Sequence, residues 1–358
     1  MTSPSSRRAH IVGLGLIGGS MALALAERGF IVSGRDHSAT TTALAIERGV
    51  ISGTDMDPEV DLVVVATPAE TVAAVVREVL ESSVAPMVVT DVAGIKGSIT
   101  RAVDDPRYIG GHPMAGSEQR GLDGARADLF RGCTWVLTPT ERTDADSYSR
   151  LHGILRELEA NVMALDVDTH DRLVAMASHV PHLVAGALMN EATVIAESDG
   201  ALLQLAAGGF RDMTRVSAGD PAIWPDVLIE NADAVAAGLQ SLRNRLELLQ
   251  RDIMTGDRSS LMSELTNAAL ARRELPGRGV RSEELTHLRI PVPDRPGVLA
   301  EVTTTASDLN VNIFDIEIAH SVEGQPGVIL IAVERGDSER LAQALESHGY
   351  RVAHEDPT

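Results

Sequence analysis

Short apolar runs alternate with longer amphipathic segments through the first 167 residues of the chain. The runs at 9–15, 30–33, 62–66, 87–90, 107–110, 133–138 and 162–165 have the length of strands. Segments rich in Ala and Leu at 16–28, 40–49, 70–81 and 145–160 have the length of helices. The run at 62–66 contains no polar residue, which is typical of a parallel strand covered by helices on both faces. This alternation predicts an α/β domain with a doubly wound parallel sheet over residues 1–167.

The pattern changes after residue 167. Residues 170–254 contain long stretches of Ala, Leu and Val with few helix breakers, so we expect an all-helical domain over 168–275. Helices that are apolar on several faces are commonly buried against other protein surfaces, which favours a homodimer. A linker is expected at 276–284, within a charged stretch that contains Pro and Gly.

The last part of the chain, residues 285–358, again mixes strands and helices. Strand patterns at 287–292, 311–319 and 328–334 alternate with helical patterns at 297–308 and 337–348, and a turn signal lies at 323–327. This order predicts a small α+β domain.

The composition restricts the partners. Hydrophobic residues make up 44% of the chain but aromatic residues only 3%, so the cores must be aliphatic. A net charge of −20 argues against nucleic acid and anionic membranes as partners, because both require basic surfaces. A negatively charged substrate would therefore need local positive groups to bind it.

Cys133 is the only cysteine, so no disulfide can form within the chain, which fits a reducing compartment. The polar N-terminus has no apolar signal segment, and no run approaches the roughly 18 apolar residues of a membrane span. We therefore expect a cytoplasmic protein.

A glycine-rich turn follows the first predicted strand. Gly13, Gly15 and Gly18 have the spacing GxGxxG, and Asp36 ends the second strand. In such a turn the first glycine permits the sharp bend, the second admits a pyrophosphate and the third allows close helix–strand packing. The pattern predicts a Rossmann-type domain that binds a dinucleotide at a helix N-terminus.

Asp36 is expected to bind the adenosine ribose and to repel a 2′-phosphate, which favours NAD over NADP. Arg35 complicates this choice, because an arginine there can accept that phosphate, stack on adenine or simply be solvated. Further cofactor contacts are expected from the turn and from the ends of the third and fourth strands: Leu14, Leu16, Ile17, Thr67, Pro68, Asp91 and Gly94.

His112 is expected in a loop after the strand at 107–110, at the carboxyl edge of the sheet. A histidine can exchange a proton near neutral pH, so we predict that His112 is the catalytic acid–base group. Ser117 and Glu118 follow it closely and are predicted to orient it or the substrate.

His179 and His182 are spaced i, i+3 and are predicted to share one face of a helix that Pro181 kinks. A metal site is disfavoured, because no Cys, Asp or Glu nearby completes an obvious ligand set. The two histidines are predicted to line a substrate pocket.

Arg211, Asp212 and Arg215 follow within one helical segment. Arg215 either pairs with Asp212 or presents its guanidinium to a carboxylate of the substrate. Trp224 either caps the same pocket or belongs to the core.

Four sequence runs resemble the prephenate dehydrogenase family: VGLGLIGGS at 12–20, HPMAGSE at 112–118, HDRLVAMASHVPH at 170–182 and GFRDMTR at 209–215. The resemblance implies oxidative decarboxylation of prephenate to 4-hydroxyphenylpyruvate in tyrosine biosynthesis, with NAD taking the hydride. By this resemblance His112 accepts the proton of the ring C4 hydroxyl, Arg215 binds a substrate carboxylate and His182 contacts the substrate. Ser117, Glu118 and Asp212 would line or order the pocket.

One position departs from the family pattern. The family commonly has a serine where this chain has Gly94, and that hydroxyl helps to hold the catalytic histidine. Ser98 or a water molecule is a candidate substitute. We expect His112 to be held less firmly than usual, and Gly94→Ser to preserve or raise turnover.

Residues 285–355 resemble an ACT domain, a ferredoxin-like β-α-β-β-α-β unit that commonly binds amino acids. The resemblance implies an effector site at the first strand–helix turn and the start of the next strand: Asp294, Pro296, Gly297, Val298, Leu299, Asn312 and Ile313. Tyrosine, the end product of the pathway, is the expected effector, with phenylalanine next. A module that only dimerises is the alternative.

Three other functions fit parts of the sequence. An arogenate (cyclohexadienyl) dehydrogenase would use the same chemistry, and a non-catalytic amino-acid sensor would use NAD only structurally. A 3-hydroxyacid dehydrogenase is disfavoured, because such enzymes typically use a catalytic lysine and residues 97–358 contain none.

Overall fold

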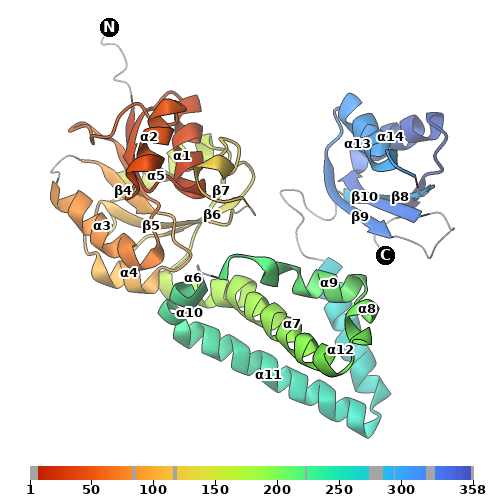
Figure 1. Ribbon diagram of the computed structural model, residues 1–358. Helices are drawn as coiled ribbons and strands as arrows, with labels where there is room; N and C mark the ends of the chain where they lie inside the picture. Colours follow the sequence, from red (N-terminus) through yellow and green to blue (C-terminus); the bar gives the residue numbers. More distant parts are fainter. Residues whose placement is uncertain are drawn as a thin grey trace. The chain divides into compact units, whose positions relative to one another are not determined.

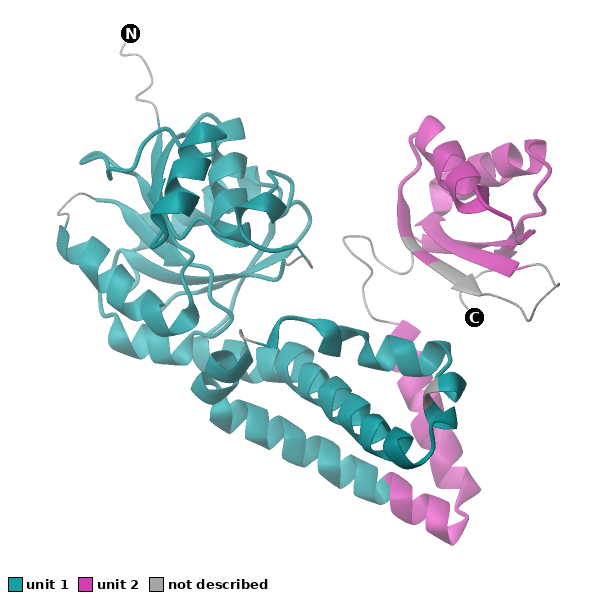
Figure 2. Ribbon diagram, viewed as in Figure 1, with its two compact units in different colours: residues 1–248 teal, residues 249–358 magenta. Residues whose placement is uncertain are grey.

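The computed structural model describes residues 7–82, 86–115, 119–221, 224–273, 285–293, 295–319 and 327–355. The chain divides into two units, residues 1–248 and residues 249–358 (Figure 2). The first unit contains a large sheet with flanking helices and most of a helical region. The second contains the end of that region and a small sheet (Figure 1).

A seven-stranded sheet forms the frame of the first unit. Its strands are β1 (Arg8–Val12), β2 (Ile31–Arg35), β3 (Leu62–Val65), β4 (Val88–Asp91), β5 (Tyr108–Pro113), β6 (Thr134–Thr138) and β7 (Asn161–Ala164), in the order β2-β1-β3-β4-β5-β6-β7. The chain runs from β1 outward to β2 and then returns to β3 on the other side of β1. In sheets of this kind, dinucleotides bind in the crevice at this reversal, outside the carboxyl ends of the strands.

Helices cover both faces of the sheet (Figure 1). Residues of α1 (Leu16–Glu27), α2 (Ala39–Glu47) and α5 (Ala145–Glu157) share one apolar core with Val64, while α3 (Ala69–Ser82) and α4 (Gly97–Ala102) share another with Val63 and Val65. Successive residues of a strand point to opposite faces, so both faces of β3 are buried. This explains why the sequence of β3 has no polar position.

The predicted loop position of His112 is wrong. β5 extends to Pro113 and includes His112, because its second half pairs with β6 in antiparallel register, with His112 opposite Val136. The sheet is parallel from β2 to β5 and between β6 and β7, with this one antiparallel pair between them. Pairing with a strand more than twenty residues later is not visible in the local pattern.

A helical region follows β7. It contains α6 (Val167–Val174), a π-helical turn (Ala175–His179), α7 (Val180–Ser198), α8 (Ala201–Leu205), α9 (Gly208–Thr214), a 3-10 turn (Arg215–Ala218), α10 (Trp224–Glu230), α11 (Ala232–Thr255) and α12 (Arg258–Arg273). Pro181 lies in the first turn of α7, directly after the π-helical turn. The helix thus continues past the proline with a local widening rather than ending there.

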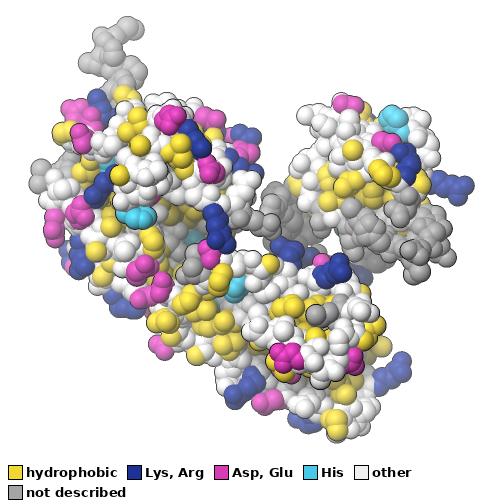
Figure 3. Space-filling model, in the orientation of Figure 1, with side chains coloured by type: hydrophobic (Ala, Val, Ile, Leu, Met, Phe, Trp, Pro, Cys, Tyr) yellow, Lys and Arg dark blue, Asp and Glu magenta, His cyan; other side chains and the backbone are white. Residues whose placement is uncertain are grey.

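The helix from Val167 to Ser198 is long and apolar enough to cross a membrane, by length and composition alone. Helices of soluble proteins also pass this test, so it is weak evidence for a membrane. Only 28% of its most apolar window is buried within this chain, and Leu188, Val194 and Ile195 are exposed. Figure 3 shows apolar side chains gathered over the helical region.

The small sheet of the second unit contains β8 (Leu285–Val292), β9 (Ile313–Ala319), β10 (Gly327–Glu334) and β11 (Ala353–Glu355), in the antiparallel order β11-β8-β10-β9. Helices α13 (Val298–Asp308) and α14 (Arg335–Ser347) share its core with Ile290 and Ile331. The element order confirms the predicted α+β domain. The predicted linker at 276–284 and most of the predicted turn at 323–327 lie outside the described residues.

Candidate active site

The glycine-rich turn joins β1 to α1 at the carboxyl edge of the large sheet. Gly13 has a φ of 95°, in the left-handed region that favours glycine. A Cβ on Gly13 would lie 2.4 Å from the Ala66 carbonyl oxygen, and one on Gly18 would lie 1.9 Å from the Gly13 carbonyl oxygen. The fold of the turn therefore requires both glycines.

Gly15 lies in a different environment, because no atom lies within 4 Å of a Cβ built there. It is the N-cap of α1, and no side chain caps the helix. The hydroxyl of Thr67, just beyond β3, is buried and has no hydrogen-bond partner. An open backbone position, an uncapped helix N-terminus and an unpaired hydroxyl together fit a bound dinucleotide.

Leu14 was predicted to contact the cofactor. Its side chain is fully buried, and its N–H donates to Asp36 Oδ2 at 2.8 Å, so neither group is free for a ligand. Leu16 and Ile17 pack partly against the core, which leaves their backbone N–H groups at the helix start as the candidate contacts.

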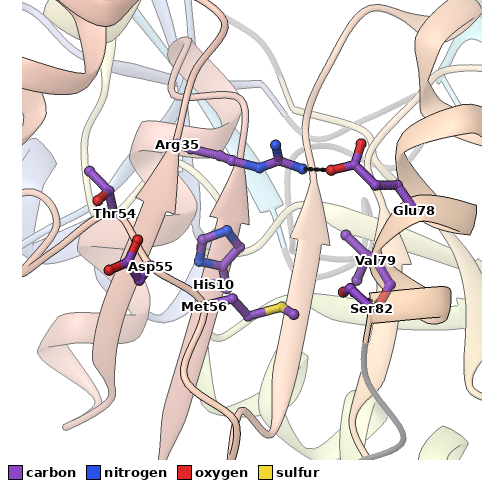
Figure 4. Close-up of a pocket in the computed structure, with 8 residues that line it drawn as sticks. All are labelled: His10, Arg35, Thr54, Asp55, Met56, Glu78, Val79 and Ser82. Carbon is purple, nitrogen blue, oxygen red and sulfur yellow. Dashed lines mark hydrogen bonds and ion pairs between the residues drawn. The ribbon is translucent and has the colours of Figure 1, made fainter.

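Asp36 is fixed beside this turn, because it also accepts the Ser38 N–H at 2.9 Å. Arg35 instead reaches Glu78 of α3 at 2.7 Å. Arg35 and Glu78 meet across one end of a pocket of about 260 Å³ (Figure 4). The other residues that line this pocket are His10, Thr54, Asp55, Met56, Val79 and Ser82. Arg35 is thus directed toward Glu78, while the carboxylate of Asp36 stays at the glycine-rich turn.

Asp91 was also predicted to line the cofactor crevice, but its carboxylate is turned inward and fully buried. It pairs with the equally buried ammonium group of Lys96, which is the only lysine in the sequence. Its other donors are the Ala93 N–H at 3.0 Å, the Tyr108 hydroxyl at 2.9 Å and the Gly111 N–H at 3.1 Å. Burial lowers the pKa of Lys96 while Asp91 raises it, and burial and Asp91 both raise the pKa of Tyr108.

Two glycines let β5 pass close to this buried pair. A Cβ on Gly110 would lie 3.0 Å from Lys96 Cδ, and one on Gly111 would lie 2.6 Å from the Asp91 carbonyl oxygen. A Cβ on Gly110 would also lie 2.4 Å from Thr138 Oγ1 of β6, so the Gly-Gly pair before His112 is required by the packing of β5 against its neighbouring strands as well as against Lys96.

His112 takes part in a chain of hydrogen bonds. Its Nδ1 lies 2.9 Å from His170 Nε2, and His170 Nδ1 lies 2.8 Å from Asp171 Oδ1. Asp171 in turn accepts the backbone N–H groups of Lys96 at 2.9 Å and Gly97 at 2.7 Å. The other side of the imidazole faces Gly94, where an added Cβ would lie 3.7 Å from both Cε1 and Nε2.

The electrostatic environment keeps His112 neutral. Burial lowers the pKa of His112 to about 3, with further contributions from Lys96, His170 and His179 and an opposing one from Asp171. Burial raises the pKa of Asp171, but hydrogen bonds from His170, Lys96 and Gly97 outweigh it and hold that pKa below its usual value. At neutral pH, a neutral imidazole is therefore connected through His170 to an ionised carboxylate.

His179 and His182 meet at Trp224. The ring of Trp224 stacks on His182 with centroids 3.6 Å apart and contacts the edge of His179 at 6.3 Å. Burial lowers the pKa of both histidines. His179 is almost fully buried and lies 3.4 Å from the side-chain amide of Asn231, so His182 is the more accessible of the two.

Arg211 and Asp212 are exposed on α9, and Arg215 begins the 3-10 turn after it. Within the described parts of the chain, neither arginine pairs with Asp212, so the guanidinium of Arg215 is available to a ligand. This turn lies beside α7, since a Cβ on Gly219 would be 3.9 Å from His182. Ser117 and Glu118 lie outside the described residues.

Sequence reasoning missed several residues of the site. Tyr108, His170, Asp171 and Asn231 were not predicted, although His170 and Asp171 lie within a run that was quoted for the family. Lys96 was placed only in a loop expected to line the cofactor crevice, and its pairing with Asp91 was not predicted. One signal was available for Lys96. Only one of the 31 lysine and arginine residues is a lysine, which is unusual. The use of lysine in place of arginine at residue 96 therefore indicated a special role for this position.

The candidate effector residues surround the start of α13. Gly297 is its N-cap with a φ of 92°, which follows Pro296, and Val298 is buried while Leu299 is exposed. Asn312 is exposed just before β9, which begins at Ile313. Asp294 lies outside the described residues.

Three family models match consecutive parts of the chain. The nucleotide-binding domain of prephenate dehydrogenase matches residues 21–164, its dimerization domain matches residues 166–267 and the ACT domain matches residues 286–349.

Individual relatives match over nearly their full length. A probable prephenate dehydrogenase, NovF, of Streptomyces niveus is 32% identical over 95% of this chain and 97% of its own. The prephenate dehydrogenase of Bacillus subtilis (strain 168) is 29% identical over 93% of this chain and 94% of its own.

Solved structures match about three quarters of the chain. A prephenate dehydrogenase from A. aeolicus in complex with hydroxyphenyl propionate and NAD+ has a TM-score of 0.71 at 26% identity, covering 76% of this chain and 100% of its own. An arogenate dehydrogenase from Synechocystis has a TM-score of 0.66 at 31% identity, covering 74% of this chain and 98% of its own.

Proposed function

Because this chain belongs to the prephenate dehydrogenase family, we propose that it catalyses the NAD-dependent oxidative decarboxylation of prephenate to 4-hydroxyphenylpyruvate. It is an oxidoreductase with a Rossmann-type domain, a helical domain and an ACT domain. The observation that carries the proposal is the position of His112. A neutral, largely buried histidine stands at the carboxyl end of β5, on the edge of the sheet that also bears the glycine-rich turn.

The residues around the turn fit NAD. The open position at Gly15 and the N–H groups of α1 would hold the pyrophosphate, and Asp36 would hold the ribose hydroxyls. Thr67, beside Pro68, would gain the hydrogen-bond partner that its buried hydroxyl lacks. The negative charge of Asp36 opposes a 2′-phosphate, which supports NAD over NADP. Bound NAD supplies the acceptor for the hydride that leaves ring C4.

His112 has the protonation state that a proton acceptor needs. In the proposed reaction the O–H bond of the ring C4 hydroxyl breaks and an N–H bond forms on His112. The ring carboxylate then leaves as carbon dioxide, and the electron pair of its C–C bond completes the aromatic ring. The ring oxygen takes a proton back from His112 as the ring becomes aromatic, so the product is a phenol and the step is strongly favoured.

Binding of the substrate is assigned to the helical domain. Arg215 would pair bidentately with a carboxylate, which an arginine does better than a lysine. His182 and the stacked Trp224 would form one wall of the pocket. His179, Arg211, Asp212, Ser117 and Glu118 are proposed to complete or order it. A substrate with two negative charges needs such local cations in a chain with a net charge of −20.

Arogenate is the second candidate substrate. A similar structure is named an arogenate dehydrogenase, and a relative of Zymomonas mobilis, 29% identical over 74% of this chain, is named a cyclohexadienyl dehydrogenase. The two substrates differ only in the side chain, where arogenate carries an amino group in place of a keto group. Arg215 can bind a carboxylate of either.

We further propose that the protein is a cytoplasmic homodimer inhibited by tyrosine. The exposed apolar residues of α7 belong to the part of the chain that matches a dimerization domain, which supports burial against a second copy. The match to an ACT domain supports an amino-acid effector at the start of α13, where Gly297 leaves backbone N–H groups for its carboxylate.

The test is NADH formation with prephenate and with arogenate, each with and without tyrosine. We expect turnover of prephenate with NAD, suppression by tyrosine and loss of turnover in His112→Gln with NAD affinity retained. Arg215→Lys should raise KM for prephenate about 10-fold or more, because a point charge replaces a bidentate contact. Turnover of neither substrate by a protein that binds NAD would refute the proposed activity.

A further inference from the structure

We propose that His170, held by Asp171, is a positioning residue that fixes the tautomer of His112, so that Nδ1 carries the proton and Nε2 is the proton acceptor. This inference rests on the proposed role of His112, but it concerns two residues that touch neither reacting atom. It starts from the chain of hydrogen bonds that runs from Asp171 through His170 to His112.

Asp171 determines the direction of this chain. An ionised carboxylate has no proton and can only accept hydrogen bonds. Its oxygens accept from the N–H groups of Lys96 and Gly97, which belong to the backbone and cannot be reversed. The contact of 2.8 Å between Asp171 Oδ1 and His170 Nδ1 therefore requires the proton to be on His170 Nδ1.

The proton on His170 Nδ1 determines the tautomer of His112. When His170 carries a single proton, which the contact with Asp171 places on Nδ1, its Nε2 has only a lone pair and accepts from His112 Nδ1 across their 2.9 Å contact. His112 is then protonated on Nδ1, and its Nε2 holds a lone pair on the side that faces Gly94. An isolated neutral imidazole side chain prefers the opposite tautomer, which would place a proton where the base is needed.

The same chain stabilises the charge that forms during the reaction. When Nε2 takes a proton, the His112 cation faces Lys96 and His179, which disfavour it, and Asp171, which favours it. Asp171 acts through His170, the residue in direct contact with His112. Asn231 holds this segment in place, since its side chain donates to the Asp171 carbonyl oxygen at 2.8 Å.

This arrangement also accounts for Gly94. His170 holds His112 from the Nδ1 side, so the orientation of the ring does not require a hydroxyl at residue 94. His112 is therefore not loosely held, as the glycine at residue 94 led us to expect, because His170 anchors it instead.

Two substitutions of His170 test the inference, because they separate the hydrogen bonds of this side chain from its size. Gln keeps an acceptor for His112 and a donor for Asp171, whereas Leu keeps neither. We expect His170→Leu to lower kcat about 100- to 1,000-fold with KM for both substrates nearly unchanged, and His170→Gln to recover at least about 10-fold of that loss. His152→Leu is the control, because it removes a partly buried histidine of α5 whose ring packs against Tyr148, with centroids 6.0 Å apart, away from the proposed site; its kcat should stay within about twofold. Equal losses in His170→Gln and His170→Leu, or a loss confined to KM, would overturn the role.

A spectroscopic measurement needs no substitution at His170 and no substrate. The imidazole nitrogens of the wild-type enzyme, labelled with 15N-histidine, report the tautomer of each ring, and the His112 signals are those absent from His112→Gln. Protonated Nδ1 with unprotonated Nε2 supports the inference, and the reverse overturns it. If neither prephenate nor arogenate is turned over but this tautomer is found, the proposed activity fails and the inference stands.

Discussion

Removal of the charge of Lys96 should destabilise the large sheet more than any exposed charge does. The side chains of Lys96 and Asp91 are both 0% exposed, so Lys96→Met would leave a buried carboxylate without its counter-ion. Breaking such a pair costs about 3–5 kcal/mol. For a unit of this size, that loss corresponds to a fall in Tm of about 6–20 °C.

The partner substitution provides the internal control. Asp91→Asn alone also breaks the pair, but the double variant leaves no unpaired charge. We therefore expect the losses in unfolding free energy of the two single variants, added together, to exceed the loss of the double variant by about 2–3 kcal/mol. Additive losses would show that the two groups do not depend on each other. Arg142→Met is the matched surface control, because Arg142 and Asp104 pair at 2.6 Å but are 64% and 67% exposed, and such a pair contributes about 1 kcal/mol or less.

The assay is urea unfolding followed by tryptophan fluorescence. Trp135 is fully buried in the core of the large sheet, and the only other tryptophan is Trp224 in the helical region. In a Trp224→Phe background the signal reports the sheet alone. A loss below about 1 kcal/mol for Lys96→Met would refute the reasoning, because it would mean that water or rearrangement compensates the buried carboxylate.

Three further outcomes follow from the geometry. Gly94→Ser should preserve or raise kcat, because its Cβ would lie 3.7 Å from the His112 ring in ordinary contact; a large fall in a folded variant would contradict this. Gly15→Ala should weaken NAD binding with little change in Tm, whereas Gly18→Ala should lower Tm because its Cβ would lie 1.9 Å from a carbonyl oxygen. Equal effects on Tm would be evidence against assigning Gly15 to the cofactor site and Gly18 to the packing of the turn. An amine-directed reagent should modify only the N-terminus of the native protein, since Lys96 is the only lysine and is buried; a second modification by mass spectrometry would show that it is accessible.

The sequence predicted what depends on local pattern. The strands and helices of the sheet, the glycine-rich turn and the acidic residue at the end of β2 all follow from spacing within a few residues. His112 was identified from its flanking motif and its place at the sheet edge. The extension of β5 through His112 was missed, because it depends on pairing with β6.

The contacts that set the state of His112 could not be predicted locally, because they join distant segments. The Lys96 N–H reaches Asp171 across 75 positions, and His112 reaches His170 across 58. Asp91 was misread for a related reason. Its position at the end of β4 indicated the crevice, but the inward direction of its side chain is set by Lys96, Tyr108 and Gly111.

Lys96 links two hydrogen-bond networks that would otherwise be separate. Its side chain neutralises Asp91 beneath β5, while its backbone N–H binds Asp171 and so supports His170. The turn between β4 and α4 therefore controls both the position of β5 and the tautomer of His112, although no side chain in it needs to touch the substrate. A substitution that shifts this turn should thus affect kcat and stability together, whereas one at His170 should affect mainly kcat. Comparison of Lys96→Met with His170→Leu in both assays distinguishes the two contributions.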